Sequence, residues 1–202
     1  MLTAPEIAEL LQADHELRAL EVKGPGERTD NHLFAKVTRA ALSMANLRDG
    51  GHIVIGIDDK TTAAMLPGLT PAQAASWLAY DAVSRKLAEY ADPPVRFELA
   101  ERGLVSQVTV VVMQIFQFDD IPVLCRRDFP DVLRKGACYV RSHRVPESAE
   151  IPTAVEMREL LDLASEKRLR AFVATAERAG VELRGGPTAV ERFDAELPGD
   201  WR

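Results

Sequence analysis

Two acidic stretches of the sequence carry side chains that could bind a divalent cation. The stretch "ELRALEVKG" holds Glu16 and Glu21 with Lys23 close by, and "IGIDD" ends on Asp58 and Asp59. Divalent cations such as Mg²⁺ take hard oxygen ligands, and a few converging carboxylates supply them. Two carboxylates about 4 Å apart repel each other by about 4 kcal/mol at an effective dielectric constant near 20. A fold that gathers three must therefore bind a cation, shift a pKa or leave the groups in solvent.

Sequence spacing alone does not show that these acids converge, and scattered surface acids are the alternative interpretation. Pairing of a strand at 19–23 with a strand at 52–57 would bring Glu21 and Asp59 together. If the second strand continues, its alternation places Asp58 and Asp59 on opposite sides, so only one of them can belong to the same site as Glu21. We expect removal of either Glu21 or Asp59 to leave folding intact or slightly improved, because a repulsive carboxylate is lost.

Residues 121–146 are the basic part of an acidic chain. Six cations less two acids give this segment a charge of +4, whereas the whole chain carries −6. Phosphate contacts from such a cluster would give salt-sensitive, sequence-independent nucleic-acid binding, and a solvated charged surface is the alternative. The candidate nucleic-acid-binding residues are Arg126, Arg127, Arg134, Lys135, Arg141 and Arg144. Arg141 lies in an expected strand, where it could instead pair with a core carboxylate.

Other chemistry is disfavoured by the motifs. Two cysteines and four scattered histidines are too few for a disulfide framework or a convincing zinc site. Cys138 lies in the apolar stretch "ACYV", which predicts a small core residue. The glycines of "GPG" and "GG" fit neither phosphate-loop pattern, so they predict turns at the ends of elements.

The composition is that of an ordinary globular protein. Of the 202 residues, 47% are hydrophobic and 28% are charged, and the length suits one domain with a terminal extension. The longest apolar stretch, "VTVVVMQIFQF", is too short and too interrupted to span a bilayer. The first residues lack a signal-peptide pattern, so we expect a cytoplasmic protein with no membrane partner.

The elements that must position the acids are mixed helices and strands. We expect helices at about 4–14, 30–47, 71–90 and 153–179, three of them preceded by a Thr-x-x-Glu/Gln capping box. Strands are expected at about 19–23, 52–57, 95–100, 106–116 and 137–142. Because helices and strands do not alternate regularly, the pattern predicts an α+β fold. The strands at 52–57 and 106–116 should be neighbours in one mixed sheet, with the 30–47 helix packed on it.

The ordered motifs resemble those of the Schlafen AlbA_2 domain family. They are "ELRALEVKG", "ALSMANLRDGGHIVIGIDD", "MLPGL", "IPVLCRR" and "ACYVRSHRVPESA", which together cover about residues 13–165. The family's usual order is E-S-x-x-x-E-F-K, A-x-A-N-x-x-G-G-x-x-x-x-G-V-x-D, Val-Gly-Leu, Pro-Val and Y-x-R-x-G-S. Here Leu17 and Val22 replace the usual Ser and Phe, and "RSHR" replaces R-x-G-S. The resemblance implies an α+β, AlbA_2-like mixed sheet with packed helices in a single domain at 1–180, followed by a loosely ordered tail at 181–202.

The resemblance also implies an activity. In Schlafen nucleases, two glutamates and an aspartate at these positions form a metal-dependent endoribonuclease site that acts on tRNA and related structured RNA. By this resemblance the catalytic residues are Glu16, Glu21, Lys23 and Asp59. Glu16, Glu21 and Asp59 would hold Mg²⁺ or Mn²⁺, and Lys23 would stabilise charge on the scissile phosphate. A role in stress response or phage defence would fit such an enzyme.

Two alternatives stay open. Many bacterial members of the family are DNA-binding or regulatory modules, so this chain could be a non-catalytic DNA-binding or RNA-binding module with incidental acids. A protein-binding adaptor is the third interpretation. Because animal Schlafen cores pair two related lobes around their RNA, we expect this single lobe to form a homodimer or a larger homo-oligomer, with contacts through 153–179 and the tail.

Overall fold

The computed structural model of the protein describes residues 1–12, 18–104, 108–142 and 147–181. The chain forms two compact units, Met1–Ala164 and Ser165–Arg202. Helix α5 (Ala154–Arg178) begins in the first unit and ends in the second. The first unit contains the sheets described below, and its mixture of helices and open sheets confirms the predicted α+β class.

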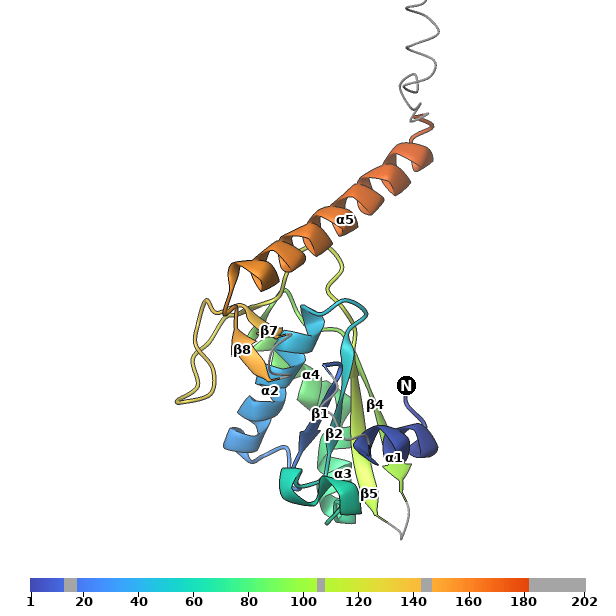
Figure 1. Ribbon diagram of the computed structural model, residues 1–202, viewed down its shortest axis with the longest axis vertical. Coiled ribbons are helices and arrows are strands. Elements are labelled where there is room, and N and C mark those ends of the chain that lie inside the picture. The colour runs from blue at the N-terminus through green and yellow to red at the C-terminus, as the bar shows by residue number, and fades with distance from the viewer. Residues whose placement is uncertain (13–17, 105–107, 143–146, 182–202) are drawn as a thin grey trace, which may run out of the picture. The chain divides into compact units, whose positions relative to one another are not determined.

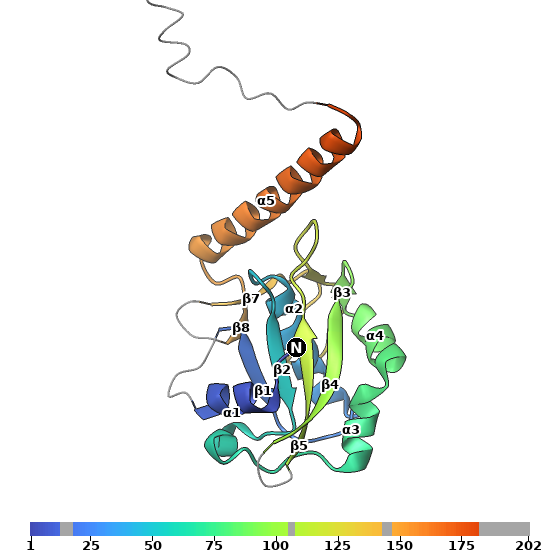
Figure 2. The ribbon, with the colours of Figure 1, turned by 90° about the vertical axis from the view of Figure 1, so that its right-hand side faces the viewer.

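A four-stranded mixed sheet forms the centre of the first unit (Figure 2). Its strands lie in the order β1 (Leu20–Lys23), β2 (Gly51–Ile55), β5 (Thr109–Ile115) and β4 (Phe97–Gly103). β1 runs parallel to β2, whereas β2–β5 and β5–β4 are antiparallel. The predicted pairing of 19–23 with 52–57 and the predicted neighbours 52–57 and 106–116 are therefore both confirmed.

Strand alternation divides the core into two layers. On one face of the sheet, Ile53 and Met113 belong to a large core with α2 (Asn31–Ala45), α3 (Pro71–Leu78) and α4 (Tyr80–Ala88). On the other face, Val54 and Val112 pack with Ile7 of α1 (Ala4–Gln12). Figure 1 shows α2 between the sheet and the strands β7 (Tyr139–Arg141) and β8 (Ser148–Glu150). The predicted packing of the 30–47 helix on this sheet is confirmed.

The helix starts follow local signals, with one exception. Asp30 caps α2 by accepting hydrogen bonds from the backbone N–H groups of His32 and Leu33. Thr70 and Gln73 form the predicted capping box of α3. The prediction of one helix over 71–90 was wrong, because Ala79 leaves the helical region (ψ 74°) and separates α3 from α4. The break turns the chain so that Trp77 and Val83 can both enter the core.

The turn between α2 and β2 requires glycine. Gly50 has a φ of +74°, and a Cβ placed there would lie 2.0 Å from the carbonyl oxygen of Ile115.

Asn46, the C-cap residue of α2, is buried and joins three parts of the chain. Its amide nitrogen donates to the carbonyl oxygens of Val123 (2.8 Å) and Tyr139 (2.9 Å), and its oxygen accepts from the Val123 N–H (2.8 Å). These bonds fix the segment that carries β7 against α2.

Several short elements escaped prediction, namely β3 (Ala91–Asp92), β6 (Leu124–Cys125) and β8, whereas β7 lies within the strand predicted at 137–142. β3 and β6 form one small antiparallel sheet, and β7 and β8 form another. A 3₁₀ helix, η1 (Asp59–Ala64), follows β2. Among the described residues, no helix combines the length and apolar character needed to cross a membrane.

Candidate functional site

The register of β1 places its two charged residues on the α2 side of the sheet. Glu21 lies opposite Ile53 and Lys23 opposite Ile55, and these isoleucines belong to the core that contains α2. The alternate residues, Leu20 and Val22, pack on the α1 side. Strand alternation therefore brings the carboxylate of Glu21 and the ammonium of Lys23 to the same face.

A cavity of about 1050 Å³ opens along β1 and is also lined by residues from the other side of the sheet, including Leu10 and Leu11 of α1. Glu21 and Lys23 line it from β1, Lys36 and Arg39 from α2, and Asp59 from the start of η1. The structure thus gathers three of the four predicted catalytic residues in one cavity. The fourth, Glu16, belongs to 13–17, outside the described residues.

The two adjacent aspartates after β2 have different positions. The strand ends at Ile55, not at 57 as predicted, so strand alternation does not separate Asp58 from Asp59. Asp58 is the N-cap of η1 and accepts a hydrogen bond from the backbone N–H of Lys60 (3.0 Å). Asp59 lines the cavity, and its carboxylate makes no hydrogen bond or ion pair with any described residue. The first aspartate shapes the turn, and the second is presented to the cavity.

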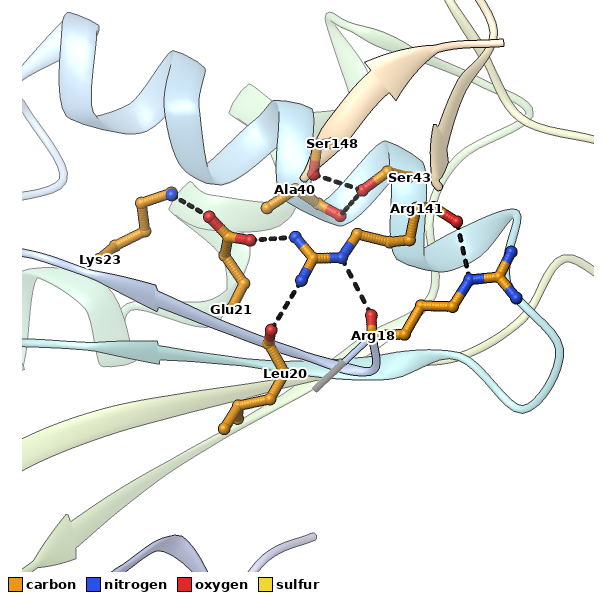
Figure 3. A network of polar contacts seen from close by, with 8 residues as sticks. All are labelled: Arg18, Leu20, Glu21, Lys23, Ala40, Ser43, Arg141 and Ser148. Carbon is orange, nitrogen blue, oxygen red and sulfur yellow. Dashed lines mark hydrogen bonds and ion pairs between the residues drawn. The ribbon is translucent and has the colours of Figure 1, made fainter. Parts of the chain in front are cut away.

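Both oxygens of the Glu21 carboxylate are bound by cations (Figure 3). The Lys23 ammonium donates to one oxygen, and the Arg141 guanidinium donates to the other. The side chain of Arg141 is 2% exposed and that of Glu21 is 18% exposed, so this ion pair is largely shielded from water. Lys23 and Arg141 pair with Glu21, and among the described residues no acid crowds it. Removal of Glu21 would leave a buried guanidinium without its counter-charge, so we now expect a loss of stability in place of the gain predicted above.

Arg141 also binds the backbone of β1 and of the residues before it. Its Nε donates to the carbonyl oxygen of Arg18, and its second terminal nitrogen donates to that of Leu20, both at 2.9 Å. In return, the Nε of Arg18 donates to the carbonyl oxygen of Arg141 at 2.7 Å. The carbonyl of Ala19 points the other way and accepts from His52 of β2. Arg141 therefore occupies the outer edge of β1, which no other strand of this sheet covers.

The described residues do not by themselves supply a metal site. Among them, no group of three His, Cys, Asp or Glu side chains lies close enough to hold a metal ion. Asp59 pairs with no described residue, but Glu21 has both oxygens engaged by Lys23 and Arg141. The predicted ligand set of Glu16, Glu21 and Asp59 would need Glu16 and a rearranged Glu21 carboxylate.

The predicted basic segment is divided between surface and interior. Arg126, Arg127, Arg134 and Lys135 are exposed, Arg141 is buried, and Arg144 lies outside the described residues. Arg127 pairs with Glu89 at 2.7 Å. Arg134 binds both carboxylate oxygens of Glu150, at 2.8 and 2.5 Å, and its hydrogen bond lowers the pKa of Glu150 below the ordinary 4.5. The exposed part of this segment is therefore partly neutralised by neighbouring acids.

Helix α2 supplies polar and basic side chains that the sequence reasoning missed. His32, Lys36 and Arg39 all line the cavity, at intervals of four and three residues. Positions spaced in this way lie on one side of a helix, so the spacing in "NHLFAKVTRA" was the signal that could have revealed them. Lys36 and Arg39 make no hydrogen bond or ion pair with the described residues.

The cysteines have the structural character expected of them. Cys125 is buried, and Cys138 packs against the core that contains α2. Burial raises the pKa of the Cys138 thiol to about 11, which keeps the group protonated and unreactive at neutral pH. Burial also raises the pKa of Cys125.

Comparisons with known proteins found two solved structures that are similar to this chain. No curated protein sequence matches the chain. A crystal structure of the DIP2311 protein from Corynebacterium diphtheriae matches with 15% identity and a TM-score of 0.48, over 73% of this chain and 26% of that one. The N-terminal domain of a RecG-related protein from Nitrosomonas europaea matches with 24% identity and a TM-score of 0.44, over 67% of this chain and 89% of that one.

The family comparison extends over the residues that build the cavity. The sequence profile described as Schlafen, AlbA_2 matches residues 16–148. The matched range includes β1 and α2, the turn that carries Asp59, and Arg141 of β7. The resemblance found in the motifs is thereby confirmed: the chain belongs to the Schlafen AlbA_2 family.

Proposed function

We propose that the protein binds nucleic acid in the cavity between β1 and α2 and that it is a metal-dependent endoribonuclease. The observation that carries the proposal is that Glu21, Lys23 and Asp59 line one cavity although 38 positions separate Glu21 from Asp59 (59 minus 21). Family membership supports a nucleic-acid-related role. The proposed substrate is tRNA or another structured RNA in the cytoplasm, in a stress or phage-defence response.

The side chains of the cavity suit work on a phosphodiester. The Lys23 ammonium can stabilise negative charge that develops on a phosphate, and Asp59 offers a carboxylate that pairs with no described residue. A divalent cation, Mg²⁺ or Mn²⁺, would supply Lewis acidity to such a reaction. Its proposed ligands are Glu16, Glu21 and Asp59, and Glu21 would have to release Lys23 or Arg141 to take part.

A non-catalytic DNA-binding or RNA-binding module is the second candidate. The engagement of both Glu21 oxygens favours it, because a carboxylate that only balances Lys23 and Arg141 has a structural role. In that case the cavity would hold nucleic acid without cleaving it.

We also propose that the protein assembles into a homodimer or a larger homo-oligomer through α5. In the second unit, Leu169 and Phe172 are 63% and 61% exposed. They lie three positions apart and therefore on the same side of the helix. Light scattering should detect a particle larger than the 22.3 kDa monomer at tens of micromolar. Replacing both residues with Glu should restore the monomer, and a monomeric parent would contradict this part of the proposal.

The two adjacent aspartates provide the matched test of catalysis. Purified protein is incubated with total tRNA, with Mn²⁺ or Mg²⁺, and then with EDTA. Asp59→Ala should abolish metal-dependent cleavage and leave RNA binding nearly unchanged, whereas Asp58→Ala should keep cleavage and cost about 1 kcal/mol of stability through loss of the cap. Glu21→Ala should also abolish cleavage, but its folding must be checked first.

Each outcome selects between the two candidates. Absence of cleavage with any divalent metal, or unchanged cleavage by the Asp59 variant, would reject the nuclease. Retained RNA or DNA binding would then support the binding module.

A further inference from the structure

The cations that line the cavity fall into two groups. Lys23 and Arg141 are both bonded to Glu21, so their charge is balanced within the protein. Lys36 and Arg39 of α2 line the same cavity and make no hydrogen bond or ion pair with the described residues. Their charge is therefore available to a ligand.

Arg39 is held in place without losing its donors. Its guanidinium lies over the ring of Tyr139, 5.5 Å from the ring centroid. That ring is buried, and its hydroxyl oxygen accepts a hydrogen bond from the backbone N–H of Arg134 (2.8 Å). The Nε of Arg39 is buried and has no acceptor among the described residues. A guanidinium positioned on a fixed ring loses less freedom when it binds a phosphate.

Lys36 complements Arg39. The two residues lie three positions apart on α2, where Cβ atoms are about 5–6 Å apart. Lys36 is exposed, and the ammonium can move on its flexible stem, whereas Arg39 is half-buried and fixed. Together they offer one mobile and one fixed cation on the side of α2 that lines the cavity.

The other acids that line the cavity, Asp30, Asp59, Asp131 and Glu147, form no ion pair with Lys36 or Arg39, although the charge of Arg39 contributes to lowering the pKa of the neighbouring Glu150. Asp30, although it lines the cavity, caps the N-terminus of α2 and accepts two backbone hydrogen bonds. Asp59 lies on η1 and pairs with no described residue. By contrast, Arg127 and Arg134 of the exposed basic segment each bind a glutamate.

We infer that Lys36 and Arg39 are the principal phosphate-binding residues of this cavity and that they hold the sugar–phosphate backbone of the nucleic acid. The inference rests on the proposed nucleic-acid binding, but not on catalysis. By this inference, Lys36 and Arg39 contribute more to nucleic-acid binding than the exposed segment that contains Arg126 and Arg127. Charge-assisted hydrogen bonds from a fixed arginine and a nearby lysine suit the oxygens of a phosphodiester.

The test compares two pairs of cations of equal charge. Binding of fluorescently labelled tRNA and of a labelled single-stranded RNA is measured by anisotropy in EDTA, so that cleavage does not interfere. Lys36→Ala/Arg39→Ala should weaken binding at least tenfold and reduce the slope of log K against log salt by about 2, one for each lost contact. Arg126→Ala/Arg127→Ala removes the same charge and should weaken binding less than threefold.

A pair of single charge reversals guards against misfolding of the double variant. Lys36 and Arg126 are both exposed, so Lys36→Glu and Arg126→Glu should fold alike, as circular dichroism and thermal unfolding would verify. Lys36→Glu should weaken binding more strongly. Arg39→Lys keeps the charge but loses the planar fork, and it should fall between the parent and the double variant.

The outcomes distinguish a failure of the inference about Lys36 and Arg39 from a failure of the proposed nucleic-acid binding. Equal losses from the two double variants would overturn the inference, because only net charge would then matter. RNA binding that is unaffected by the Lys36 and Arg39 changes would also overturn it, while nucleic-acid binding would stand. A parent protein that binds neither RNA nor DNA would reject the proposed function itself.

Discussion

Two arginine–glutamate pairs of the first unit use the same chemistry in different surroundings. Arg141 of β7 binds Glu21 of β1 with side chains that are 2% and 18% exposed. Arg134 binds Glu150 of β8 with side chains that are 64% and 42% exposed. Both arginines come from the predicted basic segment, and the possibility that Arg141 pairs with a carboxylate of the core is confirmed. The difference shows that burial decides what an arginine in this segment does.

The two surroundings give the two ion pairs very different effects on stability. An exposed pair gains little, because water and salt screen the charges and two long side chains must be held still. In a buried pair the charges have lost their hydration, so removing one partner leaves the other uncompensated. Arg141 additionally satisfies two backbone carbonyls that face away from the neighbouring strand. We therefore expect the two regions to respond very differently to the same substitution.

Arg141→Ala should produce the largest effect. Loss of a buried, hydrogen-bonded charge should lower the free energy of unfolding by about 3–5 kcal/mol. Urea unfolding followed by circular dichroism would measure the change. A loss below about 1 kcal/mol would show that the pair is not energetically buried and would remove the contrast with Arg134.

Glu21→Gln should have an intermediate effect. The amide oxygen can still accept a hydrogen bond from Arg141, but the guanidinium loses its counter-charge, and we expect a cost of about 1–3 kcal/mol. The same unfolding measurement applies. Glu101→Gln is a suitable control because Glu101 is an exposed residue of β4, and this change should leave stability almost unchanged. Val22→Ala is not suitable, because the Val22 side chain packs in the core layer on the other face of the sheet.

Arg134→Ala should have a small effect. The exposed pair should contribute little to the free energy of unfolding, because solvent screens its charges. Because salt screens exposed charges, the difference from the parent should shrink further in about 1 M NaCl, where the Debye length is about 3 Å. A cost that equals that of Arg141→Ala would contradict the role given to burial.

The smallest expected effect is a pH dependence at Glu150. The hydrogen bond from Arg134 lowers the pKa of Glu150 in the folded protein below 4.5, so the unfolded chain binds the proton more readily. The contribution of the pair is therefore fully present above the unfolded pKa and is lost as the pH falls through the lowered folded pKa. An NMR titration of the Glu150 carboxyl should show a lowered pKa that rises in Arg134→Ala. An unchanged pKa in that variant would refute the assignment.

Local sequence signals predicted the parts of the fold that depend on neighbouring residues. The Thr70–Gln73 capping box and the apolar strands β2 and β5 were readable because each signal lies within one element. The break at Ala79 was not readable, because neither Gly nor Pro marks it and the packing of Trp77 and Val83 determines it.

The candidate site could be predicted only in part. Motif spacing correctly brought Glu21 and Asp59 to one place through strand pairing. The role of Arg141 depends on contacts with residues about 120 positions earlier, which no local pattern encodes. The cations Lys36 and Arg39 were overlooked because a helix with ten of its fifteen residues buried was read only for its apolar face.

The position of Arg141 along β1 has a consequence for association between molecules. A sheet edge with free carbonyl groups is a template on which a strand of another chain can add, and natural proteins protect such edges against aggregation. Arg141 holds the outward carbonyls of Arg18 and Leu20 in hydrogen bonds, so an incoming strand would have to displace a buried guanidinium. The same side chain that balances Glu21 thus also acts as a guard against edge-to-edge polymerisation of this protein.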